Sequence, residues 1–196
     1  MFDLKHILAS PGKKISLKDY DTAYCGDYKD KDNAEDKLRD DIKKMQKLQY
    51  RLYAENKHSL LIILQAPDAA GKDGAIRHVM SGINPQGTQV YSFKQPSKEE
   101  LDHDFLWRCA KALPERGRIG VFNRSHYEEV LVVKVHPEYI LNQNLPGINS
   151  VEDVTPAFWK SRYEQINNWE KHLVENGTFT YRRRGQELEI LQSRHV

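Results

Sequence analysis

Hydrophobic positions along the chain fall into short apolar runs that alternate with stretches of helical spacing. Residues 59–65 (SLLIILQ) form an apolar run without alternation, which is typical of a strand buried on both faces of a parallel sheet. Similar shorter runs predict strands over 88–93 and 118–122. Apolar residues three or four positions apart predict a helix over 34–55, whose buried stripe is Leu38, Ile42, Met45, Leu48 and Leu52.

The remaining helices are predicted from their spacing and from their start and stop signals. Ser97 and Glu100 have the form of a capping box that opens a helix over 97–113. Pro156 and the pair Asn176-Gly177 bound a long helix over 156–175. Shorter helices are predicted over 71–81 and 125–135, with a loop over 142–153. Strands that alternate with helices predict an α/β fold with a parallel sheet.

Composition narrows the class of protein. The 196 residues carry 30 Lys and Arg against 28 Asp and Glu, a net charge of +2, which argues against binding to a bulk polyanion such as nucleic acid. No apolar stretch approaches the roughly 18 residues of a membrane helix, and residues 1–15 lack the apolar core of a secretion signal. Two cysteines provide neither a disulfide framework nor a zinc site. We therefore expect a cytoplasmic protein with no membrane partner.

A candidate phosphate loop lies between the predicted strand 59–65 and the helix that follows it. Residues 66–73 (APDAAGKD) approximate the pattern G-x-x-x-x-G-K-[ST], with Ala66 in place of the first glycine and Asp73 in place of the hydroxyl residue. The order strand, loop, helix is the one that a phosphate loop requires. The alternative is a tight turn with an ordinary surface lysine, and the Gly71-Lys72 pair opening a helix favours phosphate binding.

The chemistry of this loop follows from its residue types. The small residues Ala69, Ala70 and Gly71 allow backbone N–H groups, together with that of Asp73, to approach an anion at the helix N-terminus. Lys72 is placed to neutralise phosphoryl oxygens. Asp68 supplies a carboxylate for Mg²⁺, in place of the missing Ser or Thr.

A second constellation, residues 122–129 (FNRSHYEE), follows the third predicted strand. Ligands of open α/β sheets gather beyond the C-terminal ends of strands, so this segment should face the phosphate loop. Arg124 could clamp a phosphoryl group, and Glu128 could join Asn123 as a metal ligand. The alternatives are a helix cap for Asn123 and an ion pair between Arg124 and Glu128.

Several neighbouring residues are candidates of lower rank. Arg77 on the loop's helix either contacts phosphate or pairs on the surface, and Lys94 after the second strand either contacts an anion or is exposed. We expect His126 to be a solvated helix residue and Glu129 to lie on the surface. We expect the remaining aromatic and thiol side chains of the helices to pack in the core, namely Phe105, Trp107, Cys109, Trp159 and Trp169.

These motifs resemble those of the polyphosphate kinase 2 family. Residues 65–80 (QAPDAAGKDGAIRHVM) are similar to its phosphate loop, and residues 118–131 (RIGVFNRSHYEEVL) to its second motif. Residues 52–55, 93–97 and 135–138 are also similar, and the resemblance runs from about residue 36 to residue 177.

The resemblance implies a P-loop kinase-like three-layer sandwich. The implied activity is Mg²⁺-dependent phosphoryl transfer between inorganic polyphosphate and ADP or AMP. Carried over by position, Asp68 lies near Mg²⁺ and the transferred phosphate, and Lys72 and Arg124 bind phosphate. Asn123 belongs to the second motif, whereas Glu128 is a ligand that we add on physical grounds. Members of the family tend to assemble, so homo-oligomers are expected.

The sequence departs from the family in two places. Ala66 replaces a glycine at the loop entry and would weaken the loop if a positive φ were needed there. Residues 178–196 have only a short β-like start, over 178–181, and no long apolar run, so a central strand and an arginine-rich lid are expected to be missing. The fold would then be incomplete at the C-terminus, and residues 61–64 would form an exposed apolar edge.

The expected organisation is an N-terminal arm over 1–32, a phosphotransferase core over 33–177 and an atypical tail over 178–196. We interpret the tail as a sign that the reading frame is shortened or altered near residue 178. The leading functional hypothesis is a polyphosphate:nucleotide phosphotransferase. The alternatives are a catalytically impaired phosphate-binding remnant of that family, another small-molecule P-loop kinase, and a non-enzymatic interaction module.

Overall fold

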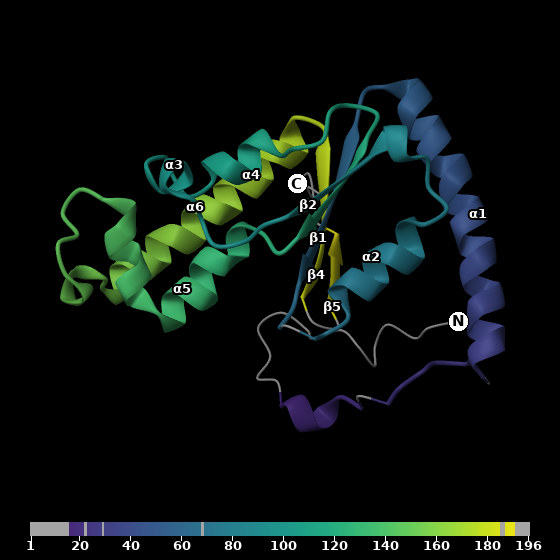
Figure 1. The fold of residues 1–196 in the computed structure, drawn as a ribbon, viewed down its shortest axis with the longest axis horizontal. Helices are drawn as coiled ribbons and strands as arrows, with labels where there is room; N and C mark the ends of the chain where they lie inside the picture. The colour runs from purple at the N-terminus through teal and green to yellow at the C-terminus, as the bar shows by residue number, and fades with distance from the viewer. Residues whose placement is uncertain (1–15, 22, 29, 68, 185–186, 191–196) are drawn as a thin grey trace, which may run out of the picture.

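The computed structural model describes residues 16–21, 23–28, 30–67, 69–184 and 187–190 (Figure 1). Its strands are β1 (Ser59–Gln65), β2 (Thr88–Ser92), β3 (Ile119–Asn123), β4 (Thr178–Arg184) and β5 (Glu187–Ile190). Its α-helices are α1 (Lys31–Glu55), α2 (Lys72–Met80), α3 (Lys98–Leu101), α4 (Trp107–Lys111), α5 (Val132–Val135) and α6 (Pro156–Glu175). Short 3₁₀ helices are η2 (Leu17–Asp19), η3 (Pro85–Gly87), η4 (His126–Val130), η5 (Pro137–Gln143) and η6 (Val151–Asp153).

The sheet lies between two layers of helices. Its strand order is β2-β3-β1-β4-β5, and β5 alone of these strands runs antiparallel to its neighbour. Helices α1 and α2 cover one side of the sheet, while α3, α4, α5 and α6 lie on the other (Figure 1). The predicted α/β three-layer arrangement is therefore confirmed.

The sheet corrects the expectation that residues 61–64 form an exposed edge. β4 pairs with β1 in parallel along its whole length, from Ser59 opposite Thr178 to Gln65 opposite Arg184. The Oγ of Ser59 donates a hydrogen bond of 3.0 Å to Thr178 Oγ1. A strand needs paired backbone groups rather than an unbroken apolar run, and the alternating sequence from Thr178 to Tyr181 meets that need.

Helix α1 begins three residues earlier than predicted, and its buried stripe differs from the prediction at one position. Leu38, Ile42, Met45 and Leu52 are half-buried, whereas Leu48 is 60% exposed and Gln49 is buried in its place. Gln49 Nε2 donates to the carbonyl of Asn84 at 3.0 Å, so the buried amide is satisfied.

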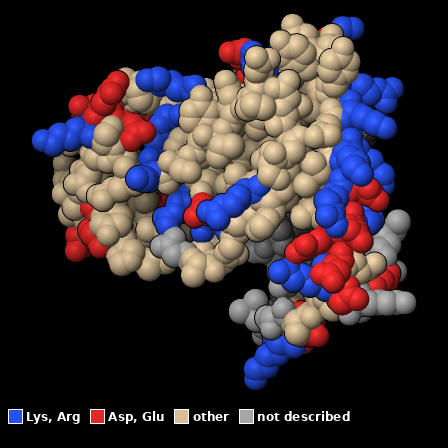
Figure 2. Space-filling model, turned by 45° about the vertical axis from the view of Figure 1, so that its right-hand side comes forward, with Lys and Arg blue, Asp and Glu red and all other residues tan. Residues whose placement is uncertain are grey.

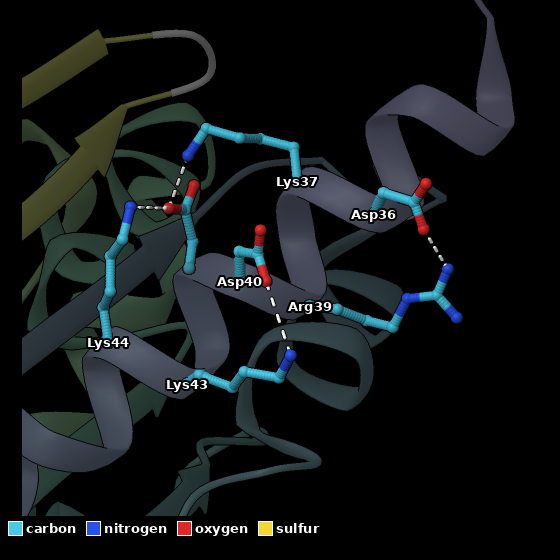
Figure 3. A network of polar contacts seen from close by, with 7 residues as sticks. Asp36, Lys37, Arg39, Asp40, Lys43 and Lys44 are labelled. Atoms are coloured by element: carbon cyan, nitrogen blue, oxygen red, sulfur yellow. Dashed lines mark hydrogen bonds and ion pairs between the residues drawn. The ribbon is translucent and has the colours of Figure 1, made fainter.

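The outer face of α1 carries ion pairs between neighbouring turns. Figure 3 shows Asp36 paired with Arg39, Asp40 with Lys43, and both Lys37 and Lys44 on a single carboxylate, that of Asp41. Lys37 lowers the pKa of that carboxylate. Charges of both signs gather along the α1 side of the molecule, with a broad uncharged face beside them (Figure 2). These pairs are exposed to solvent, so each contributes little to stability.

Two predicted helices are interrupted. The capping box of Ser97 and Glu100 is present, but α3 ends at Leu101 and α4 begins at Trp107. The carboxylate of Asp104 accepts a hydrogen bond from the backbone N–H of Leu106 at 2.9 Å, which competes with continuous helix. The helix expected over 125–135 is instead the 3₁₀ helix η4 followed by α5.

The core lies between the sheet and α6. Its buried cluster consists of Leu61, Ile63, Cys109, Ala112, Phe122, Tyr127, Val130 and Ile166, with Phe93, Phe105, Leu113 and Trp169 packed against it. Within the described ranges, every helix is too short or too polar to cross a membrane.

Candidate functional site

The phosphate loop leaves β1 at Ala66 and enters α2 at Lys72. Positive φ angles occur at Ala69 (62°) and at Gly71 (81°), the N-cap of α2, whereas Ala66 does not adopt one. The loop needs no positive φ at residue 66, so the replacement of glycine by Ala66 carries no cost in φ. The left-handed conformation of Ala69 costs about 1–2 kcal/mol, which the surroundings must offset. Asp68, the expected loop carboxylate, lies outside the described residues.

Lys72 folds back over the loop that precedes it. Its Nζ donates hydrogen bonds to the carbonyl oxygens of Ala66, at 2.7 Å, and Pro67, at 2.8 Å. This ammonium group sits at the N-terminal end of α2, where the helix dipole already favours an anion. The arrangement presents a positive charge where phosphoryl oxygens would bind.

Asn123 links the end of β3 to the start of α2. Its Nδ2 donates to Asp73 Oδ1 at 2.6 Å and to Ser92 Oγ at 3.4 Å. The alternative of a helix cap is wrong, because Ser125 is the N-cap of η4 and accepts a hydrogen bond from the backbone N–H of Tyr127. The second motif and the phosphate loop thus meet at the C-terminal edge of the sheet, as the topology predicts.

Arg124 occupies a sharp turn directly after β3. Its φ is 64°, and its backbone N–H donates to the carbonyl of Leu64 at 3.0 Å, which fixes the turn against β1. Left-handed geometry in a residue other than glycine costs about 1–2 kcal/mol and persists only where its surroundings hold it.

Glu128 is held by the last residue of β1. Gln65 Nε2 donates to Glu128 Oε1 at 2.5 Å, and Gln65 Oε1 accepts a hydrogen bond from Ser125 Oγ at 3.2 Å. Gln65 is 9% exposed, and Ser125 is fully buried. This chain of hydrogen bonds sets the position of the carboxylate relative to the phosphate loop.

Two cavities flank this turn. One, of about 750 Å³, lies between the loop residues Ala66 and Pro67, the second-motif residues Arg124 and Glu128, and an apolar wall on α5 and α6. The other, of about 300 Å³, is also lined by Arg124 and Glu128. Arg124 and Glu128 therefore stand between the two spaces.

The smaller cavity combines cationic and aromatic groups. Lys94, Arg108 and Arg124 line it together with Phe93 and Phe105, and so do the carboxylates of Glu100, Glu128 and Glu129. Arg108 Nη1 donates to the carbonyl of Lys94 at 2.8 Å and its guanidinium lies over the ring of Phe93, so this charge is held in place. The cations suit phosphate groups and the rings suit a planar ring, while Glu100, 3.8 Å from Arg108, offsets part of the positive charge.

Arg77 lies apart from the two cavities. It is exposed on the second turn of α2 and lines neither of these cavities, whereas Lys94 lines one of them. The contact of Arg77 with phosphate stays a prediction.

Two expectations about the second motif are wrong. His126 is 2% exposed and Glu129 is 7% exposed, although both were expected at the surface. His126 Nε2 lies 3.2 Å from Glu170 Oε1, and Glu129 Oε1 lies 3.2 Å from Arg162 Nε. These partners come from α6 and provide the polar contacts that make burial tolerable.

Burial controls the ionisation of this region. It raises the pKa of the Glu129 carboxyl, although the nearby charge of Arg162 and hydrogen bonds from Gln143 act in the opposite direction. The same burial lowers the pKa of Arg162. Burial also raises the pKa of the Cys109 thiol to about 12. The ion pair between Glu129 and Arg162 is consequently a costly internal feature rather than a surface pair.

The sequence of α6 contains a signal for these buried partners. The buried stripe of this helix is Trp159, Arg162, Ile166, Glu170 and Leu173. Charged residues at two positions of an otherwise apolar stripe indicate buried partners elsewhere in the chain. Gln65 and Arg108 offer no comparable signal, because a polar residue at a strand end or on a short helix is ordinary.

The described residues hold no group of three or more His, Cys, Asp or Glu side chains that could bind a metal by themselves. Asp73 and Glu128 nevertheless place carboxylates at the edge of the sheet that carries the loop. Mg²⁺ in phosphoryl-transfer enzymes takes one or two carboxylates and completes its shell with phosphate oxygens and water. The donor set fits a metal of that kind.

The chain is similar in sequence to known polyphosphate phosphotransferases. Residues 28–183 match the family model of polyphosphate kinase 2. The chain is 51% identical over 174 residues to an ADP-polyphosphate phosphotransferase of Rhodopseudomonas palustris, covering 89% of this chain and 59% of the relative. It is 44% identical over 136 residues to an AMP/ADP-polyphosphate phosphotransferase of Meiothermus ruber, covering 69% of this chain and 45% of the relative.

A solved structure supports the same fold. The crystal structure of polyphosphate kinase 2 from Arthrobacter aurescens TC1 superposes with a TM-score of 0.75 at 36% sequence identity, over 89% of this chain and 57% of that one. The chain thus spans between about half and three fifths of the length of these relatives.

Proposed function

Because the chain belongs to the polyphosphate kinase 2 family, we propose that it transfers a phosphoryl group between inorganic polyphosphate and ADP or AMP. The observation that carries the proposal is the meeting of the phosphate loop with the second motif. Lys72 folds over the loop, and Arg124 stands between the cavity that borders the loop and the cavity lined by cationic and aromatic groups.

Each cavity has a role in this proposal. The larger one borders Ala66 and Pro67, and it accommodates the polyphosphate end next to the loop. The smaller one accommodates the nucleotide, whose phosphates contact Lys94 and Arg108 and whose ring packs against Phe93 or Phe105. Arg124 lines both spaces and can therefore contact the phosphoryl group in transit.

Catalysis in this site is mostly positioning and charge neutralisation. Lys72 would move from the loop carbonyls to the phosphoryl oxygens, and the backbone N–H groups of Ala69, Ala70, Gly71 and Asp73 would bind the same anion. Arg124 would stabilise the charge that develops during transfer. Arg77 would add a further contact on the side of α2.

Phosphoryl-transfer enzymes of this kind generally use a divalent metal. We propose Mg²⁺, held by Asp68 and Glu128 with Asn123 beside them, which would supply further neutralisation of phosphate charge. Gln65 orients the Glu128 carboxylate, and Asn123 donates a hydrogen bond to Asp73, so Glu128 and Asn123 are held in place before the metal binds.

We also propose that the chain acts in the cytoplasm, where its nucleotide substrates are found, and without nucleic acid as a partner. Self-association is supported by the exposed apolar side chains of Leu131, Val132 and Val135 beside the larger cavity. Light scattering coupled to size-exclusion chromatography tests the oligomer.

A direct assay tests the function. Purified protein is incubated with long-chain polyphosphate, Mg²⁺ and either ADP or AMP, and nucleotide products are separated by anion exchange. We expect a nucleotide that gains one phosphate and no product when polyphosphate is left out. A folded protein that yields no product with either nucleotide contradicts the proposal. If that protein still binds polyphosphate, it is a phosphate-binding remnant of the family.

A further inference from the structure

Helix α6 buries two charged side chains, and both reach the second motif. Arg162 is 7% exposed and Glu170 is 1% exposed. They lie eight residues apart, about 12 Å along the helix axis. Between them they contact His126, Tyr127 and Glu129, three of the five residues of η4.

Glu170 is the deeper of the two. One of its oxygens, Oε1, lies 3.2 Å from His126 Nε2 and accepts a hydrogen bond from the hydroxyl of Tyr127. A carboxylate only accepts hydrogen bonds, so His126 Nε2 is the donor in this pair. His126 Nδ1 is buried without a hydrogen-bond partner, so the polar contact that orients the ring is the one with Glu170. The ring also packs edge-on against Trp169.

Arg162 holds the other end of η4. Its guanidinium lies 3.2 Å from Glu129, donates to Gln143 Oε1 at 2.9 Å, and stacks over Phe105. Gln143 in turn donates to both carboxylate oxygens of Glu129, each at 3.0 Å. η4 is therefore fixed to α6 by polar contacts at both ends.

The contacts of Glu170 begin two residues beyond the strained turn at Arg124. The turn is held from the sheet side by Leu64 and Gln65, through the backbone N–H of Arg124 and the hydroxyl of Ser125. On the other side, Glu170 holds His126 and Tyr127, the residues that follow Ser125. A residue with positive φ keeps its conformation only while the surrounding structure holds it.

We propose that Glu170 is a positioning residue for phosphoryl transfer, which acts by holding the turn that presents Arg124. This inference rests on the proposed function of Arg124. It predicts that loss of the Glu170 carboxylate lowers turnover more than it weakens binding of either substrate, because Arg124 is needed most when charge develops during transfer.

The test compares Glu170→Gln with Glu164→Gln. Glu164 lies on the same helix, is exposed, and pairs only loosely with Lys160 at 4.0 Å, so its variant controls for loss of one negative charge on α6. We expect kcat of Glu170→Gln to fall about tenfold, with KM for nucleotide and polyphosphate within about threefold of wild type. Unchanged kcat in a folded Glu170→Gln protein overturns the proposal.

A double-mutant cycle with Arg124→Lys separates positioning from general damage to the fold. If Glu170 acts through Arg124, adding Glu170→Gln to Arg124→Lys lowers kcat by less than about twofold. Independent, multiplicative losses in the double variant overturn the proposal. Should Glu170→Gln fail to fold, Tyr127→Phe removes one donor to the same oxygen, and we expect kcat to fall a few-fold in the same direction.

One readout does not depend on activity. The backbone amide signals of Arg124 and Ser125 in ¹H–¹⁵N spectra should shift in Glu170→Gln and stay in place in Glu164→Gln. If wild-type protein shows no phosphoryl transfer, the proposed function fails, while these signals still decide whether Glu170 holds the turn. Unmoved amide signals in Glu170→Gln overturn the inference whatever the activity.

Discussion

Gln65 and Glu128 are joined by a hydrogen bond of 2.5 Å that ties the last residue of β1 to the second motif. The same side chain accepts a hydrogen bond from Ser125, so one amide serves two residues of the site. Gln65→Leu removes both contacts while keeping a side chain of similar length. We expect stability to fall by about 1–3 kcal/mol, because the buried hydroxyl of Ser125 loses the acceptor of its hydrogen bond.

We expect Gln65→Leu to lower turnover by more than its loss of folding stability explains, because Glu128 is no longer held in place. Urea unfolding gives the loss in stability, and turnover at increasing Mg²⁺ concentration shows whether the freed Glu128 binds metal less well. The matched control is Gln46→Leu on α1, whose amide contacts the carbonyl of Gly82 far from the site. If the Mg²⁺ dependence of Gln65→Leu equals that of wild type, the proposal that Glu128 binds the metal is contradicted.

Lys72 carries the positive charge of the phosphate loop. Lys72→Met keeps the length of the side chain but removes the charge and both hydrogen bonds to the loop carbonyls. We expect turnover to fall at least about a hundredfold, since no other described lysine folds over this loop. The control is Lys160→Met on the exposed face of α6. If Lys72→Met turns over at close to the wild-type rate, the proposed role of Lys72 in phosphate binding is wrong.

The two thiols should react very differently. Cys25 is exposed, whereas Cys109 is fully buried and its pKa is raised to about 12. A thiol needs to be both accessible and ionised to be alkylated. We expect iodoacetamide at about pH 8 to label Cys25 in the native protein and both residues in denaturant, as read by mass spectrometry. Rapid labelling of Cys109 without denaturant would show that the core beside η4 opens readily.

Gly177 ends α6 with a φ of 83°. A Cβ at this position would lie 2.9 Å from Arg116 Nη1 and 3.3 Å from the carbonyl oxygen of Lys57. Gly177→Ala should therefore cost about 1–2 kcal/mol in the free energy of unfolding. Gly74→Ala is the matched substitution, because a Cβ on this helical residue meets no atom within 4 Å. It should stabilise by about 0.5–1 kcal/mol. Thermal unfolding that ranks these variants in the opposite order would contradict the geometry.

The buried carboxyl of Glu129 should make the folded protein less stable as the pH rises. Burial raises its pKa in the folded protein above the ordinary value of 4.5, so the folded state holds this proton more tightly than the unfolded state does. The carboxyl therefore contributes stability fully below pH 4.5, and this contribution is lost as the pH rises through the folded-state pKa. The Glu129→Gln variant has no carboxyl group to titrate at this position, so it does not lose this stability as the pH rises.

The measurement is the free energy of unfolding of wild type and Glu129→Gln in urea between about pH 4.5 and 7. Wild type should become less stable relative to the variant as the pH rises. The opposite trend would mean that the charge of Arg162 outweighs burial and holds the pKa of Glu129 below 4.5.

The sequence predicted the parts of the fold that follow from apolar periodicity. The bounds of β1 and α6 agree with prediction, because one is a continuous apolar run and the other has Pro156 at its start and Gly177 beyond its end. The break between α3 and α4 was not predicted, since it depends on the single side chain of Asp104 competing for a backbone N–H.

The positions of residues in the fold were predicted where they belong to a motif, and were missed where polar residues are buried in pairs. Lys72 and Arg124 lie at the expected edge of the sheet. His126 and Glu129 were misplaced because their burial depends on Glu170 and Arg162, which are distant in sequence. The pairing of β4 with β1 was missed for a related reason: backbone hydrogen bonds with a distant segment leave little trace in local hydrophobicity.

The central place of β1 has a consequence for synthesis of the chain. Ser59 pairs with Thr178, 119 residues later, so the strand that carries the phosphate loop lacks one neighbour until the end of α6 has been made. At about 5–20 residues per second, a ribosome needs roughly 6–24 s to cover that distance. During this time Leu61 and Ile63, which are fully buried in the finished sheet, lack β4 on one side, and until β3 has been made they lack a strand on the other side too. A newly made chain is therefore most exposed to aggregation just after its phosphate loop has been completed.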